Sequence, residues 1–126
     1  MSHTSPVAVF NDIPDTVEML IQALRGAGLH AAVGATTQDG FDVAAFIREH
    51  DPSVVLFDIN PPYAKSLEKF RRLRADAFPR LPVFLTTTDG HHLERWLEPG
   101  EVRGVFRKPC DVERLAEAIR QAMPAE

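Results

Sequence analysis

The sequence predicts an α/β fold, a doubly wound five-stranded parallel sheet with the strand order 2-1-3-4-5 and helices on both faces. Short apolar runs alternate with amphipathic stretches along the chain, a pattern typical of β-α-β units. The apolar runs are consecutive rather than alternating, as parallel strands buried on both faces require. A length of 126 residues suits one such domain.

The first strand and helix are predicted before residue 30. Residues 7–10 form a compact apolar run that ends at the polar pair Asn11–Asp12, and they predict a buried strand. A helix follows, because apolar side chains recur with the spacing i, i+3, i+4, i+7 at Val17, Leu20, Ile21 and Leu24. Pro14 suits the start of this helix and Gly26 suits its end.

The next two strands flank a second helix. Residues 31–37 are small and tolerate the β conformation, so they predict a weaker strand. Apolar residues at 43, 46 and 47 predict a helix that ends before Pro52. Residues 53–58 predict a strand more strongly than any other segment, and this strand ends in Asp58.

The second half of the chain repeats the alternation. A helix over about 64–75 is expected to bury Leu67 and Phe70 and to present its basic side chains to water, namely Lys69, Arg71, Arg72 and Arg74. Residues 82–87 and 104–107 predict strands, and residues 92–97 predict a short helix between them. The last helix follows an expected N-cap at Asp111 and buries Val112, Leu115, Ala116, Ile119 and Met123.

Right-handed crossovers between these strands favour a flavodoxin-like arrangement, whose functional crevice lies beyond the carboxyl ends of the strands. Four of the five predicted strands deliver polar residues to that edge: Asn11, Asp12, Asp58, Asn60, Thr87 and Lys108. Strands one, three, four and five are neighbours in this order, so we expect these side chains to converge.

The residue types at this edge predict phosphoryl transfer to an aspartate. Asp12 and Asp58 are paired carboxylates, the hard oxygen ligands that suit Mg²⁺. A carboxylate beside a divalent cation can attack a phosphoryl group and form an acyl phosphate. The Lys108 ammonium would neutralise the phosphoryl oxygens, and the Thr87 hydroxyl would donate to them.

From Val7 to about Met123 the chain resembles the receiver domain of two-component response regulators. The resemblance is carried by Asn11-Asp12 followed by Pro14, by Asp58-Ile59-Asn60-Pro61-Pro62, by Thr87 after Pro82-Val83-Phe84-Leu85, and by Lys108-Pro109. It implies that Asp58 is the phosphoacceptor and that Asp12, Asp58 and the backbone carbonyl of Asn60 bind Mg²⁺. It further implies that Thr87 and Lys108 grip the phosphoryl group, and that the Lys108–Pro109 peptide bond is a candidate for the cis form.

We also expect a particular domain organisation and particular binding partners. Residues 1–126 are expected to be a single receiver domain without an output domain. Its phosphoryl donor would be a sensor histidine kinase or a phosphotransfer protein. A downstream protein would bind the face made by the short fourth helix, the fifth strand and the last helix. The domain would be a binding switch rather than an enzyme, and a homodimer is compatible with it.

Two positions depart from the family pattern. Strand one usually ends in two acidic residues, but the first is Asn11 here, so we expect weakened Mg²⁺ binding in which Asn11 contacts the ion through water. The family often has Tyr or Phe three residues before the lysine, where this chain has Val105. Phe106 cannot replace it, because neighbouring strand residues face opposite sides. Asn60 and Asp89, each two residues after a predicted site residue, are candidate modulators of dephosphorylation.

Composition excludes several classes of protein. The single cysteine, Cys110, excludes an internal disulfide, and a net charge of -4 argues against binding to a nucleic-acid backbone. No apolar run approaches the roughly 20 residues of a membrane span, and residues 1–6 lack the pattern of a signal peptide. We therefore expect a cytoplasmic protein that does not insert into membranes.

Other readings of the same residues stay open. Asn11 and Val105 favour a pseudo-receiver, an interaction module that works without phosphorylation. A phosphatase with an aspartyl nucleophile is disfavoured, since Asn60 stands where its second aspartate is expected, and a flavin-binding flavodoxin lacks a suitable phosphate loop. The pair His91–His92 is expected in a solvated loop, and Trp96 either in the core or on a partner surface.

Overall fold

Five strands alternate with five helices in the computed structural model, which describes residues 5–34, 40–107 and 112–124. In chain order they are β1 (Val7–Phe10), α1 (Pro14–Gly26), β2 (Ala31–Gly34), α2 (Val43–His50), β3 (Val54–Asp58), α3 (Tyr63–Ala77), β4 (Val83–Thr87), α4 (Gly90–Glu94), β5 (Gly104–Arg107) and α5 (Val112–Ala122). The predicted alternation is confirmed.

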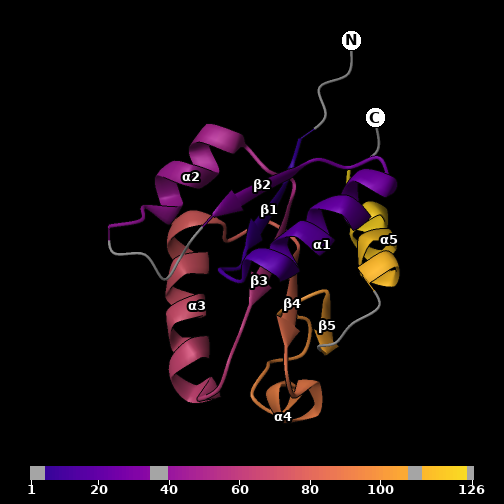
Figure 1. Ribbon diagram of the computed structural model, residues 1–126. Coiled ribbons are helices and arrows are strands. Elements are labelled where there is room, and N and C mark those ends of the chain that lie inside the picture. The colour runs from indigo at the N-terminus through magenta and orange to yellow at the C-terminus, as the bar shows by residue number, and fades with distance from the viewer. Residues whose placement is uncertain (1–4, 35–39, 108–111, 125–126) are drawn as a thin grey trace.

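The strands form one parallel sheet in the order β2-β1-β3-β4-β5, as predicted. Phe10 pairs with Phe57, and Asp58 pairs with Thr86, so β1, β3 and β4 end at neighbouring levels. The arrows of β3 and β4 point toward the end of the molecule at which α3 begins and α4 lies (Figure 1). The residues that follow β1, β3 and β4 therefore lie at the same edge of the sheet.

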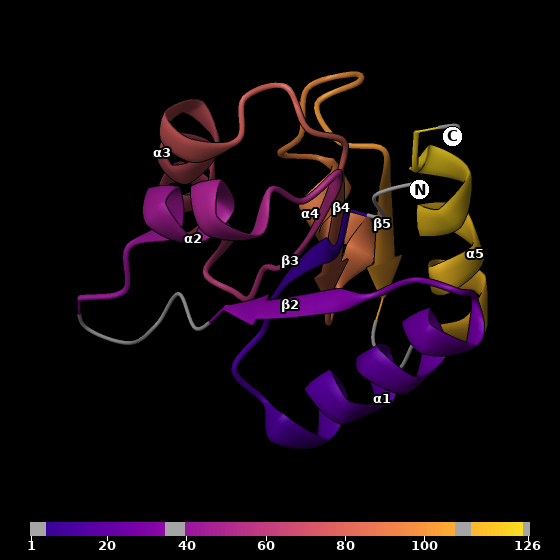
Figure 2. The same cartoon turned by 90° about the horizontal axis from the view of Figure 1, so that it is seen from above.

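Helices cover both faces of the sheet, α2 and α3 on one side and α1 and α5 on the other (Figure 2). Alternate residues of each strand divide between two apolar cores. Ala8, Phe10, Val55 and Phe57 face the core shared with α2 and α3, whereas Val7, Val9, Val54 and Leu56 face the core shared with α1 and α5. Consecutive apolar residues are needed because neither face is left to water.

The fourth helix differs from the prediction of residues 92–97. It spans Gly90–Glu94, because the Asp89 side chain is its N-cap and accepts a hydrogen bond from the backbone N–H of His92 at 3.1 Å. The pair His91–His92 consequently lies on this helix rather than in a loop, although both side chains are exposed. Trp96 follows the helix and keeps 45% of its surface exposed, so it is not a core residue.

Two arginines of α3, Arg71 and Arg74, bind other parts of the protein, whereas the sequence predicts that they face water. The Arg71 guanidinium donates to both carboxylate oxygens of Glu101, at 2.7 and 2.9 Å, and to the backbone carbonyl of Trp96 at 2.8 Å. Arg74 donates to the backbone carbonyls of Glu101 and Leu81. The hydrogen bond from Arg71 holds the pKa of Glu101 below its usual value. These bonds fasten the segment between α4 and β5 to α3.

Several predictions fall on residues that the structure does not describe: the end of the second strand after residue 34, the cis form of the Lys108–Pro109 bond, Cys110 and the Asp111 N-cap. A cis peptide bond joins Pro61 to Pro62. None of the helices in the described ranges is long and apolar enough to cross a membrane.

Candidate functional site

Asp58 stands at the carboxyl end of β3, in the middle of the sheet edge, and is partly buried. One of its carboxylate oxygens accepts a hydrogen bond from the Thr86 hydroxyl at 2.8 Å, and the other accepts one from the Asn60 side-chain amide at 3.0 Å. Both donors are neutral, so they orient the carboxylate without removing its charge. An oriented carboxylate at a sheet edge is suited to act as a nucleophile or a metal ligand.

Asn11 and Asp12 follow β1 directly, beside the end of β3. Asn11 is only 5% exposed, and its side-chain oxygen accepts a hydrogen bond from the N–H of Ile13 at 2.9 Å. Its Nδ2 is buried and finds no hydrogen-bond acceptor among the described residues. Asp12 is exposed and does not cap α1, since the N-cap residue is Ile13, which makes no side-chain cap bond.

Asn60 presents both of its polar groups at this edge. Its side chain contacts Asp58, and its backbone carbonyl accepts a hydrogen bond from the Ser66 hydroxyl in the first turns of α3. A carbonyl oxygen has two lone pairs, so this bond leaves one acceptor position for a metal. Asn60 is therefore held near the carboxylate that it was predicted to accompany.

The two threonines at the end of β4 face different partners. Thr86, which lies opposite Asp58 in the strand register, is the one whose hydroxyl reaches the Asp58 carboxylate. Thr87, the predicted phosphoryl-binding residue, is fully buried, and its hydroxyl lies 2.6 Å from the Tyr63 hydroxyl. The neighbouring Thr88 is exposed. The structure thus brings Thr86 to Asp58 and places Thr87 beside Tyr63.

Val105 and Phe106 point to opposite faces of the sheet, as predicted. Val105 packs against the core on the side of α2 and α3, and Phe106 against the core on the side of α1 and α5. A Cβ added to Gly90 would lie 3.7 Å from a Val105 methyl group, so the side chain of Val105 lies beneath the start of α4. Phe106 therefore cannot occupy the position that Val105 holds.

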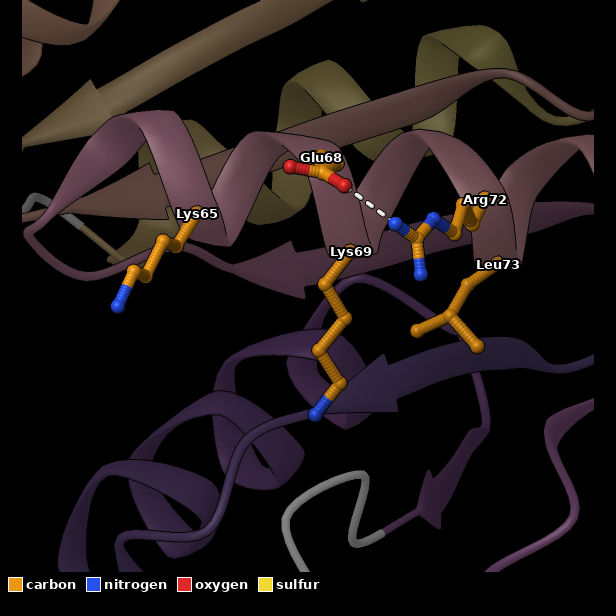
Figure 3. A pocket seen from close by; sticks show the side chains of 5 residues that line it. All are labelled: Lys65, Glu68, Lys69, Arg72 and Leu73. Atoms are coloured by element: carbon orange, nitrogen blue, oxygen red, sulfur yellow. Dashed lines mark hydrogen bonds and ion pairs between the residues drawn. The ribbon is translucent and has the colours of Figure 1, made fainter.

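Of the remaining predicted residues, one caps a helix and one lies outside the described part of the chain. The Asp89 carboxylate is engaged as the N-cap of α4. Lys108 is outside the described residues. A hollow on the outer surface of α3, lined by Lys65, Glu68, Lys69, Arg72 and Leu73, contains none of the residues predicted from the strand ends (Figure 3). Its Glu68 and Arg72 form an ion pair within the helix.

Oxygen donors are the groups that this edge offers to a metal. Among the residues described, no group of three or more His, Cys, Asp or Glu side chains could hold a metal ion. Mg²⁺ does not need such a group, because it is bound by one or two carboxylates and keeps several waters. Asp12, Asp58 and the Asn60 carbonyl fit that donor set, and the buried Nδ2 of Asn11 could donate to a metal-bound water.

Tyr63 was not recognised in the sequence as a residue of this region. It is the first residue of α3 and is 4% exposed, and its hydroxyl contacts Thr87 and the backbone of Asp89. It is the single tyrosine of the chain, and it follows two prolines at the start of a helix. Those features were the available signal, but its contact with β4 depends on a tertiary approach across 24 residues.

Known proteins resemble this chain in sequence and in structure. The model of the response regulator receiver domain family matches residues 7–120. The DNA-binding response regulator MtrA of Mycolicibacterium smegmatis is 32% identical over 114 residues, which are 90% of this chain and 48% of that protein. MtrA of Mycobacterium tuberculosis strain H37Rv is 30% identical over the same length, again 90% and 48% of the two chains. The chain spans about half the length of the curated relatives it matches.

Solved structures show the same fold. The N-terminal signal receiver domain of a two-component response regulator from Bacteroides fragilis has a TM-score of 0.72 at 21% identity, covering 98% of this chain and 100% of that one. The chemotaxis protein CheY4 of Vibrio cholerae also has a TM-score of 0.72, at 18% identity, covering 96% and 100%. At these identities the likeness concerns the fold alone.

Proposed function

The chain belongs to the response regulator receiver domain family, and on that premise we propose that it is a phosphorylation-controlled switch that accepts a phosphoryl group on Asp58. The observation that carries the proposal is the environment of Asp58. Its carboxylate ends the central strand at the sheet edge, and each of its oxygens accepts a hydrogen bond from a neutral side chain. Asn11 and Asp12 follow the neighbouring strand.

The proposed chemistry is transfer of a phosphoryl group from a phosphohistidine or a small acyl phosphate. An Asp58 oxygen donates an electron pair to phosphorus and forms a P–O bond. The P–N or P–O bond of the donor breaks, and the leaving imidazole or carboxylate keeps that electron pair. The donor would be a histidine kinase or a phosphotransfer protein, and the loaded domain would bind a downstream protein through the face made by α4, β5 and α5.

Mg²⁺ is the proposed cofactor, with Asp12, Asp58 and the Asn60 carbonyl as its protein ligands. When bound, the ion would neutralise negative charge on the phosphoryl oxygens. Asn11 supplies no charge, so we expect weaker binding than two acidic residues at the end of β1 would give. Its buried Nδ2 is a donor for which a metal-bound water is a fitting acceptor.

Hydroxyl and ammonium groups would hold the transferred phosphoryl. Lys108 is the proposed ammonium. Thr86 already donates to Asp58, whereas Thr87 would first have to leave Tyr63. Asn60 and Asp89 remain proposed modulators of the decay of the acyl phosphate.

The test is incubation with Mg²⁺ and acetyl phosphate, read by intact mass spectrometry. We expect a labile mass gain of one phosphoryl group in the wild type and none in Asp58→Asn. Asp42→Asn is the matched control, because Asp42 is an exposed N-cap on α2 and asparagine caps equally well. Absence of the gain in the wild type, or its persistence in Asp58→Asn, would refute the proposal.

Absence of the mass gain in the wild type would favour the second candidate, a pseudo-receiver that binds partners without phosphorylation. The observations behind it are the uncharged Asn11 and the small Val105 beneath α4. Where the wild type does show the mass gain, the variants Thr86→Val, Thr87→Val and Thr88→Val would identify which hydroxyl binds the phosphoryl group. Thr88 is the exposed control of this series.

A further inference from the structure

We propose that Tyr63 is a positioning residue that couples Thr87 to the start of α4, so that departure of Thr87 toward a phosphorylated Asp58 is transmitted to that helix. The inference rests on the proposed function, because it assumes that Thr87 moves to the phosphoryl group. It assigns a specific role to a residue of α3, outside the strand ends on which the site itself is built.

The Tyr63 hydroxyl lies between β4 and α4. It is 2.6 Å from the Thr87 hydroxyl, donates to the backbone carbonyl of Asp89 at 3.2 Å, and accepts from the backbone N–H of Asp89 at 3.2 Å. Asp89 is in turn the N-cap of α4. One phenolic oxygen therefore contacts the last residue of β4 and the residue from which α4 starts.

The contact extends to the exposed surface through the ring of Tyr63. Its centroid lies 5.5 Å from that of the His92 imidazole, with an angle of 33° between the two planes. Tyr63 is 4% exposed, whereas His92 is exposed on α4. A change at the buried hydroxyl can thus reach a surface side chain through two groups in direct contact.

The Tyr63 hydroxyl can donate its proton to either of two neighbours. A tyrosine hydroxyl has one proton to donate, and Thr87 and the Asp89 carbonyl are both acceptors for it. Rotation of the Thr87 side chain toward Asp58 would break the 2.6 Å contact. Without that anchor the buried phenol would shift, and its two longer bonds to the Asp89 backbone at the start of α4, both 3.2 Å, would loosen with it.

A merely stabilising tyrosine would make the same contacts, so the test needs a response that depends on phosphorylation. Hydrogen–deuterium exchange of the amides of residues 89–94 supplies it, measured with and without Mg²⁺ and acetyl phosphate. In the wild type we expect phosphorylation to speed this exchange by about fivefold, the factor that corresponds to the loss of one typical hydrogen bond.

Tyr63→Phe keeps the ring and removes the hydroxyl. We expect its unphosphorylated form to exchange as fast as the phosphorylated wild type, with no further change on phosphorylation. Thr87→Val removes the other end of the contact and should also abolish the phosphorylation response. Thr88→Val, which deletes an exposed hydroxyl in the same loop, should behave as the wild type.

The outcomes separate this inference from the function on which it rests. A phosphoryl mass gain in the wild type without faster exchange at residues 89–94 would overturn the role of Tyr63 and leave the proposed function standing. An undiminished exchange response in Tyr63→Phe would overturn it equally. Absence of the mass gain in the wild type would refute the proposed function, and the inference with it.

Discussion

Replacing Glu101 with glutamine should loosen the segment between α4 and β5. Glu101 receives two charge-assisted hydrogen bonds from Arg71 and one bond from the backbone N–H of Glu98 at 3.0 Å. Its side chain is 15% exposed and that of Arg71 is 41% exposed, so water screens the pair only in part. Glutamine keeps the shape and one acceptor, but it removes the charge and one of the two bonds from Arg71, because its amide NH2 is a donor.

The expected loss in the free energy of unfolding is about 1 kcal/mol at neutral pH, the upper end of the range for surface ion pairs. That end of the range applies because the geometry is bidentate and the carboxylate is largely covered. In a domain of this size the loss corresponds to a fall in Tm of about 3–6 °C. Urea denaturation followed by Trp96 fluorescence or circular dichroism would measure it.

The difference in unfolding free energy between the wild type and Glu101→Gln should decrease as the pH falls. The hydrogen bond from Arg71 lowers the pKa of Glu101 in the folded state and raises that of Arg71. The Glu101 carboxylate therefore contributes stability that is complete above its unfolded pKa of about 4.3 and is lost as the pH falls through the lower folded value. The difference between the wild type and Glu101→Gln should shrink accordingly between about pH 5 and pH 2.

Glu117→Gln is the matched control. Glu117 also pairs with an arginine, Arg120, but both side chains are about half exposed on α5 and lie three residues apart on one helix. We expect no resolvable change in stability from this substitution. Equal effects of the two substitutions, or an effect of Glu101→Gln that is the same at pH 3 and pH 7, would contradict the reasoning.

Two further variants test the core and the metal site. Gly34→Ala would place a methyl group 2.7 Å from the ring of Phe10, which is packed against three other phenylalanines, so we expect a loss of about 1–3 kcal/mol in urea denaturation. Gly26→Ala is the control, because the added methyl group meets nothing within 4 Å at the end of α1 and should stabilise the protein slightly. An unchanged stability of Gly34→Ala would show that the Phe10 ring can move aside. Asn11→Asp should lower the Kd for Mg²⁺ by about tenfold in calorimetric titration, since metal affinity responds on that scale to neighbouring polar groups. An unchanged Kd would remove Asn11 from the site.

The strand ends were predictable because their signals are local. A consecutive apolar run that ends in Asp58 indicates a buried parallel strand, and the order of polar endings indicates which residues share the sheet edge. The beginning of α4 was less predictable, since capping by Asp89 competes with other polar residues nearby. Which of three consecutive threonines faces Asp58 depends on the register between β3 and β4, and a spacing from Pro82 does not contain that information.

The alternation of strands and helices and the parallel sheet could be predicted from the amino-acid sequence, because hydrophobic periodicity and chain connectivity are properties of short segments. The side-chain partners became visible in the folded chain alone: Thr86 on Asp58, Tyr63 on Thr87, and Arg71 on Glu101. Each of these pairs joins residues 24 to 30 positions apart. Such contacts depend on how whole elements pack, and a one-residue change of register between β3 and β4 would take Thr86 away from Asp58.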